Sequence, residues 1–232
     1  MTDEQRAVRT VEATMNWEKS SSPGVKASTQ LIKKAEVKGH QVYEYRLKVS
    51  GAPHNQIYKL VVWPITTAVP LDMMDGLVIA QDGTVGCPAN STSTCAKRFK
   101  GAELKLTYAP EKGEIFRHAL ISGNKKTRVF FSILPDPLLQ TDKACTLEAI
   151  RLSPNFELVA IRGKGFAPGS DVSFRTQSFD EVHTATVHPE KNGQFHAQLT
   201  PFVKGHASGG TQVSAISSTC APHLSFQWGK QP

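Results

Sequence analysis

Along most of the chain, apolar and polar residues alternate with the two-residue period of β-strands. The clearest run spans residues 42–49, where every second residue from Tyr43 to Val49 is aromatic or aliphatic. Alternation of this kind predicts a strand with one buried face. In the first half of the chain, strands are also expected at residues 57–63, 77–80, 84–85, 102–108, 115–121 and 128–134.

The turns between these runs predict how the strands pair. Residues 42–49 and 57–63 flank a turn-rich loop, so we expect them to form a hairpin. Asp82-Gly83 is a strong tight-turn signal and predicts a second hairpin around it. Antiparallel strands joined in this way predict a β-sandwich for residues 27–134.

The second half of the chain contains seven short strand-like runs in fewer than a hundred residues. That number and spacing of strands are typical of an immunoglobulin-like sandwich. The expected strands are residues 145–152, 156–163, 171–177, 182–188, 194–200, 212–217 and 224–228.

Two further segments complete the predicted domain plan. Residues 1–26 form a short N-terminal segment, which has both the apolar stripe of a helix and the position of a flexible terminus. Residues 135–144 contain two prolines and are expected to be a stiff linker. The predicted fold class is therefore all-β, with two antiparallel β-sandwich (immunoglobulin-like) domains at residues 27–134 and 145–232.

A glycine- and proline-rich corner connects two of the later strands. Its sequence, Gly163-Lys-Gly-Phe-Ala-Pro-Gly-Ser-Asp-Val172, resembles the Gly-x-Gly-Phe-x-Pro-Gly-x-x-Val corner of bacterial cell-surface immunoglobulin-like modules. Gly193-x-Phe195 fits the same pattern, and the resemblance covers about residues 145–229. It implies a fold and no catalytic residues, because such modules act as spacers, adhesion units or accessory domains.

The corner also makes a packing prediction. Phe166 and Val172 are the large apolar residues of the corner, so we expect both side chains to be buried. Gly165 and Gly169 are expected at bends, where glycine is tolerated best.

The chain has four cysteines, and their positions predict two disulfides. An even count without a Cys-x-x-Cys motif argues against zinc knuckles and redox motifs. Pairing Cys87 with Cys95 and Cys145 with Cys220 keeps each bridge inside one expected domain; four free, buried thiols are the alternative. Two disulfides favour an extracellular or periplasmic location, with a signal peptide removed ahead of Met1.

The formal net charge of +7 favours an anionic partner. We expect an anionic polysaccharide or another envelope protein, and no nucleic acid, because the chain lacks a basic helix and an aromatic-basic strand motif. The alternative is a charged surface that serves solubility alone. No run approaches the about 20 apolar residues that a membrane span requires. Two basic clusters are visible: Lys97, Arg98 and Lys100, and Lys125, Lys126 and Arg128.

Two histidines suggest a surface metal site. His188 and His196 flank the turn at residues 189–193, so we expect them to be diagonal neighbours on the solvent face of a hairpin. Together with Glu190 they would offer imidazole and carboxylate ligands to a metal ion. The simpler interpretation is a pair of exposed histidines, and we expect no metal and no cofactor.

Three aromatic residues suggest a stacking platform. Tyr43, Tyr45 and Trp63 lie on the two strands of the first expected hairpin. If they project outward, they can stack on the ring of a sugar or a base. Tyr45 shares its face with Leu47 and Val49, however, so burial in the core is the alternative.

Motifs that would identify an enzyme are missing from the sequence. It has no Gly-x-Ser-x-Gly elbow and no His-Glu-x-x-His helix. We therefore expect a non-enzymatic, exported binding or structural module, an accessory of the bacterial cell envelope. The competing interpretation is a metal-dependent or carbohydrate-active enzyme or binding protein that uses the loops or the face of His188 and His196. The sequence indicates neither the ligand nor the oligomeric state.

Overall fold

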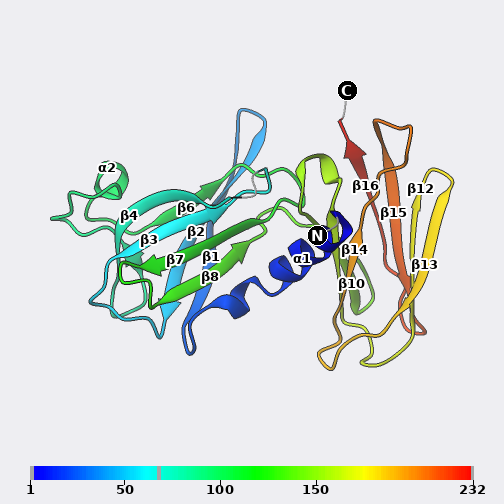
Figure 1. Ribbon diagram of the computed structural model, residues 1–232, viewed down its shortest axis with the longest axis horizontal. Helices are drawn as coiled ribbons and strands as arrows, with labels where there is room; N and C mark the ends of the chain where they lie inside the picture. Colours follow the sequence, from blue (N-terminus) through cyan, green and yellow to red (C-terminus); the bar gives the residue numbers. More distant parts are fainter. Residues whose placement is uncertain (1–2, 67–68, 231–232) are drawn as a thin grey trace. The chain divides into compact units, whose positions relative to one another are not determined.

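The structure is a computed structural model that describes residues 3–66 and 69–230. The described residues form an all-β protein, in which sixteen strands make four sheets. The chain divides into two compact units, and Figure 1 shows the strands of both. The central unit contains residues 16–111 and 115–135, and the C-terminal unit contains residues 3–15, 112–114 and 136–230.

The central unit has two antiparallel sheets. The three-stranded sheet has the order β1-β2-β6, and the five-stranded sheet has the order β5-β4-β3-β7-β8. The strands of the first are β1 (Lys26–Val37), β2 (His40–Ser50) and β6 (Lys105–Tyr108). Those of the second are β3 (Tyr58–Trp63), β4 (Leu71–Ile79), β5 (Val85–Gly86), β7 (Phe116–Ser122) and β8 (Arg128–Ile133).

Both sheets of the central unit contribute to one hydrophobic core. Leu47 of β2, Leu60 of β3 and Leu120 of β7 are each 0% exposed and belong to the same cluster. The two-residue period places these side chains on the inner faces of their sheets. The arrangement is sandwich-like. The expected hairpin of residues 42–49 and 57–63 is wrong, because β2 and β3 lie in different sheets.

The β1–β2 hairpin continues beyond the rest of its sheet. Its register runs from Lys26 paired with Ser50 to Val37 paired with His40, whereas β6 pairs only with residues 43–46 of β2. Lys38 and Gly39 form the tip, both with positive φ. Figure 1 shows the hairpin projecting from its sheet.

The first disulfide closes a short loop over β4. Cys87 and Cys95 are bonded, as the sequence predicts, and the helix α2 (Ala96–Phe99) follows directly. The loop is fixed to the strand because the Asp75 carboxylate accepts a hydrogen bond of 2.8 Å from the Thr94 backbone N–H and a second one from the Thr94 hydroxyl. These bonds lower the pKa of Asp75. The predicted Asp82-Gly83 turn is also confirmed, since it joins β4 to β5.

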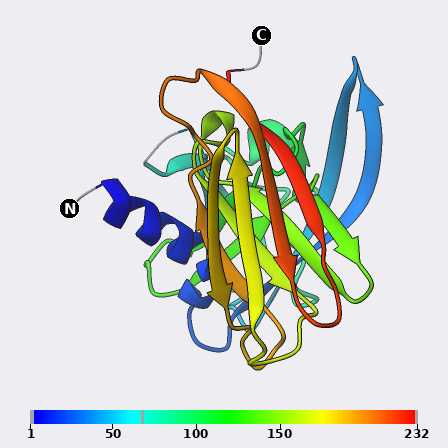
Figure 2. The same cartoon turned by 90° about the vertical axis from the view of Figure 1, so that its right-hand side faces the viewer.

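The C-terminal unit has two four-stranded antiparallel sheets. Their orders are β14-β11-β10-β9 and β13-β12-β15-β16. The first consists of β9 (Leu138–Asp142), β10 (Cys145–Arg151), β11 (Val159–Lys164) and β14 (Phe195–Leu199). The second consists of β12 (Val172–Ser178), β13 (Glu181–Val187), β15 (Ser208–Ile216) and β16 (His223–Gly229). Figure 2 shows the second sheet face-on.

The glycine-rich corner packs into the core of this unit, as the sequence predicts. Phe166 and Val172 are buried at 2% and 0% exposure, and Gly165 and Gly169 have positive φ. The corner is held against the turn at residues 189–193, because the Phe166 N–H donates to the Gly193 carbonyl at 3.1 Å. Both expectations about this corner are confirmed.

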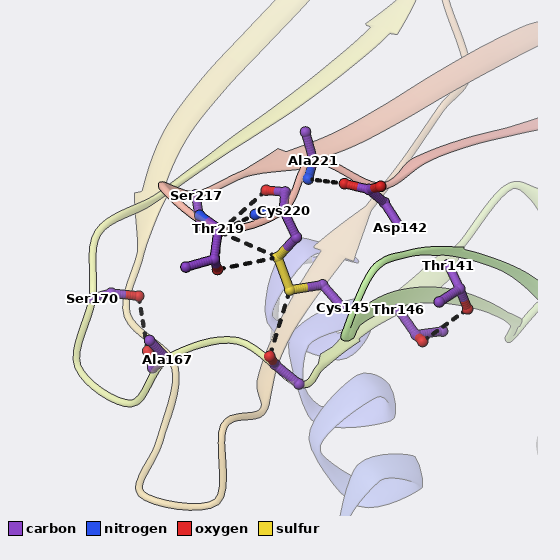
Figure 3. Close-up of a disulfide and its surroundings, with 11 residues drawn as sticks. Thr141, Asp142, Cys145, Thr146, Ala167, Ser170, Ser217, Thr219, Cys220 and Ala221 are labelled. Atoms are coloured by element: carbon purple, nitrogen blue, oxygen red, sulfur yellow. Dashed lines mark hydrogen bonds between the residues drawn. A yellow bond between two sulfur atoms is a disulfide. The ribbon is translucent and has the colours of Figure 1, made fainter.

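The second disulfide links the two sheets of the C-terminal unit. Cys145 begins β10, and Cys220 lies in the loop between β15 and β16. Ser217 contacts the disulfide at Cys220. Its hydroxyl accepts a hydrogen bond from the Cys220 N–H at 3.2 Å and lies 3.2 Å from the Cys220 sulfur (Figure 3). The Asp142 carboxylate accepts the Ala221 N–H at 2.7 Å, which ties the same loop to β9.

Two segments between or before the predicted domains have regular secondary structure. The range 135–144 is not simply a linker, because β9 forms within it and pairs with β10. The N-terminal segment is helical: α1 (Asp3–Met15) lies against β14, and the short helix η1 (Trp17–Ser20) follows it. Residues 1–2 lie outside the described part. The division into two domains at residues 27–134 and 145–232 stays a prediction.

The two disulfides should differ in their contribution to stability. They span 8 and 75 residues. In the chain-entropy treatment, closing loops of these lengths stabilises the fold by about 2.5 and about 4.5 kcal/mol. The double variant Cys145→Ser/Cys220→Ser should therefore lose more free energy of unfolding than Cys87→Ser/Cys95→Ser. Denaturant titrations of both variants measure the difference, and a larger loss from the shorter loop would contradict it.

Candidate functional site

A hollow of about 490 Å³ lies on the outer face of the five-stranded sheet in the central unit. Its floor and walls are apolar, with Val61, Trp63 and Phe130 among them. Its rim carries charged side chains from three strands and one turn. These are Lys59 of β3, Asp72 of β4, Lys125 of the β7–β8 turn and Arg128 of β8.

Strand alternation places these residues on one face. Tyr58 and Leu60 of β3 point into the core and are 0% exposed, so Lys59, Val61 and Trp63 point outward. The register then brings outward-facing partners from β7 and β8 alongside: Val61 pairs with Ala119, and Ala119 pairs with Phe130. The hollow is therefore a direct product of burying the opposite face of the sheet.

Trp17 packs against the two aromatic residues of the hollow, Trp63 and Phe130. Its indole N–H donates to the His118 carbonyl at 2.9 Å, which anchors η1 on the sheet. Its ring meets Trp63 and Phe130 edge-on, with centroids 4.9 and 5.1 Å apart. The guanidinium of Arg117 lies 5.5 Å from the centre of the Trp17 ring. Trp17 is buried, whereas Trp63 and Phe130 are half-buried, so their rings have accessible surface.

The rim of the hollow carries excess positive charge. Lys59 and Asp72 form an ion pair at 2.9 Å. Lys125 and Arg128 are exposed and make no ion pair with the carboxylates of the described residues. Two cations therefore face solvent beside an aromatic wall. The basic cluster Lys125, Lys126 and Arg128 that the sequence indicates contributes both.

This combination of groups suits the binding of an acidic sugar. Aromatic faces stack on sugar rings, and exposed cations attract carboxylate, sulfate or phosphate groups. The lining offers one carboxylate, which is paired with Lys59, and one hydroxyl, that of Ser122, which donates to the Asn124 side-chain carbonyl at 2.7 Å. Hydrolysis needs a nucleophile with its base or two facing carboxylates, and the lining residues supply neither pair.

The expected stacking platform does not form as one surface. Tyr43 is 3% exposed, and Tyr45 is half-buried against Tyr108, with ring centroids 6.2 Å apart. Tyr43 is on the same face of β2 as the buried Leu47, Tyr45 packs against the core cluster, and burial raises the pKa of Tyr45. The alternative of core packing therefore describes the two tyrosines. Trp63 alone lies at the hollow, with Trp17 and Phe130 as its partners instead.

The two candidate metal-binding histidines do not lie on one face of a hairpin, as the metal hypothesis requires. His188 follows β13 and His196 lies in β14, and these strands belong to different sheets, so the predicted hairpin is wrong. His196 pairs in register with Arg162, and His188 lies 3.2 Å from the exposed carboxylate of Asp171. Glu190 is part of the turn between the two strands. Among the described residues, no group of three or more His, Cys, Asp or Glu side chains could hold a metal ion.

Comparisons with known proteins do not assign the chain to a family. The sequence matches no protein-family model and no curated protein. One solved structure with some likeness comes from work titled "Structural insight into host cell surface retention of a 1.5-MDa bacterial ice-binding adhesin". The identity is 9% and the TM-score is 0.24; the match covers 88% of this chain and 65% of that chain, slightly less than two thirds. At these values the likeness identifies neither a fold nor an activity.

Beneath the hollow, a histidine is buried in the core without an ion-pair partner of its own. His118 of β7 is 0% exposed, and its ring stacks on Phe131 with centroids 5.0 Å apart. Its Nδ1 lies 3.2 Å from the Phe116 carbonyl, so this nitrogen carries the proton, and Nε2 accepts from the Tyr108 hydroxyl at 3.1 Å. Burial lowers the pKa of His118 to about 4 and raises that of Tyr108.

Acid should destabilise the central unit through this histidine. A histidine in an unfolded chain has a pKa of about 6.5. Between pH 6.5 and the folded pKa of about 4, His118 is therefore protonated in the unfolded chain and neutral in the folded chain. Stability is intact above the upper value and falls by about 3 kcal/mol as the pH drops through this window. Unfolding titrations at several pH values, on the wild type and His118→Phe, measure the effect. The variant should lose this part of the slope, and an unchanged slope would contradict the assignment.

Proposed function

We infer that the protein is an exported, non-enzymatic binding module and that its hollow in the central unit binds an anionic polysaccharide. The observation that carries this proposal is the juxtaposition of Trp63 and Phe130 with Lys125 and Arg128 around one apolar floor. A sugar ring stacks on the aromatic wall, while its acidic substituent meets the two exposed cations. Binding needs both, because aromatic stacking alone does not distinguish acidic from neutral sugars.

Other features of the chain support an extracellular accessory role. Two disulfides favour an oxidising compartment. No helix in the described part of the chain is both long enough and apolar enough to cross a membrane. In the C-terminal unit, two facing four-stranded sheets and the Gly163–Val172 corner fit a bacterial immunoglobulin-like module, which we propose as its class. Such a module would hold the binding unit at the cell envelope.

Binding should require an acidic polymer. Alginate, a polyuronate, is the probe, and dextran is the neutral control; titration calorimetry measures both. We expect binding to alginate only, weakened by added salt because screening reduces the attraction of exposed charges. Equal binding to dextran, or no binding to alginate, would contradict the proposal.

Variants then locate the site. Trp63→Ala should weaken alginate binding about fivefold, which corresponds to the loss of about 1 kcal/mol of aromatic contact. Lys125→Ala/Arg128→Ala removes the two exposed cations and should weaken it by at least as much. Lys97→Ala/Arg98→Ala is the matched control, because it removes two exposed cations of the same unit that do not line the hollow. An equal loss from this control would indicate a general charge effect and no specific site.

A further inference from the structure

Strand β13 is an exposed sheet edge in the C-terminal unit. It pairs with β12 in unbroken register from Val172–Val187 to Ser178–Glu181, and it ends the order β13-β12-β15-β16. Residues 181–186 are all exposed, including Val182 at 45%. Figure 2 shows the strand at one border of its sheet. Its other edge therefore presents backbone N–H and C=O groups to solvent.

The sequence of β13 has few of the features that usually protect an edge, and its one formally charged residue, Glu181, lies at its first position. Glu-Val-His-Thr-Ala-Thr-Val contains no lysine, proline or glycine, and its register shows no bulge. A run of β-prone residues with little charge favours pairing with another strand. Natural edge strands of this length are usually interrupted, charged or covered.

The other described edge strands are short, carry charges or contact another element. In the central unit, β1 carries Lys26, Lys33 and Lys34 and has a bulge, β5 has two residues and β6 has four. The edge of β8 is covered, because its Arg128 carbonyl accepts the Ser22 N–H at 2.8 Å. In the C-terminal unit, α1 lies against β14, while β9 and β16 contact each other. Among the described edge strands, β13 is therefore the one that is long, uncharged along most of its length and uncovered.

We propose that β13 pairs with β13 of a second copy of the chain, antiparallel and around a two-fold axis at Thr184. In this register Glu181 faces Val187, Val182 faces Thr186, His183 faces Ala185 and Thr184 faces itself. The two residues of each pair have both odd or both even numbers, so their side chains lie on the same face of the sheet. The two four-stranded sheets then join into one continuous sheet.

Side-chain chemistry favours this occupant over an unrelated strand. The one carboxylate of β13, Glu181, lies opposite a valine in the self-paired register, so no like charges meet. Thr184 opposite Thr184 is a favourable cross-strand pair, and the exposed Val182 gains a neighbour. The contact uses each β13 edge once, so association stops at a dimer.

A hollow next to β13 shows that the chain itself leaves this side of the core open. Its volume is about 350 Å³, and it lies between β13 and β14, which belong to different sheets. Ala185 and Val187 face it from β13, above Phe174 and Leu199. A fifth strand beside β13 extends the sheet over this opening. The dimer is independent of the polysaccharide site, which lies in the other unit.

Sedimentation of the purified protein over a range of concentrations tests the dimer. Because a single strand pair buries little area, association should be weak and concentration-dependent. The weight-average mass should rise from 25.3 kDa toward twice that value. A monomer at all concentrations would overturn the proposal and would favour a strand of another protein as the partner of β13. A series of higher oligomers would overturn the two-fold symmetry of the proposed contact.

Charge exchange at the axis tests the register. Thr184→Lys and Thr184→Glu each place like charges opposite each other, and each should weaken dimerisation about fivefold or more. An equal mixture of the two variants should restore dimers, because lysine then faces glutamate. Restoration also shows that both variants remain folded. Gln212→Lys is the matched control, since Gln212 is exposed on the same sheet but lies on β15, away from the edge. Loss of dimer in the control, or no rescue in the mixture, would overturn the proposed register.

Discussion

The two-residue alternation of strands β3, β7 and β8 is the constraint on which the candidate site depends. Leu60, Leu120 and Phe131 fill the inner face of the sheet, so their neighbours in sequence must face outward. Those neighbours include the aromatic and cationic residues of the hollow. Any slip of one residue in this register would send Trp63 into the core and a leucine to the surface. Core packing therefore holds the binding surface in place, although the two share no side chain.

Trp17 adds a second, longer-range constraint to the same surface. It comes from a short helix outside the sheet, and its indole N–H is fixed to the backbone of β7. Because it is itself buried, it limits the tilt of Trp63 and Phe130. Rigid aromatic rings lose little conformational freedom when a ligand binds, so preorganisation of this kind favours affinity.

The sequence predicted the strands better than their partners. All seven runs expected in the second half overlap β10 to β16, and the largest differences are at the starts of residues 156–163 and 212–217. Periodicity reports which face of a strand is buried, and this is a local property. It does not report the neighbouring strand, which depends on contacts between residues far apart in sequence. The two wrong hairpins, β2 with β3 and β13 with β14, are errors of this second kind.

The candidate site could be predicted only in part for the same reason. Trp63 and the cluster of Lys125 and Arg128 were visible in the sequence as separate features, but their meeting depends on the order β3-β7-β8. Trp17 and Phe130 were missed. A large aromatic residue directly after a helix, with polar neighbours, is the one local signal that Trp17 offers. The disulfide pairs were predictable because each cysteine has one partner within the same expected domain.

The projecting β1–β2 hairpin has a consequence for how this protein can vary. Its tip at Lys38-Gly39 lies beyond the last residue that pairs with β6, and most of β1 packs on no core residue. Loop tips of this kind accept inserted sequence with little effect on folding. The hairpin is therefore a place where related chains can differ in length, or where a fluorescent label or an epitope can be added, while the hollow on the other sheet keeps its shape.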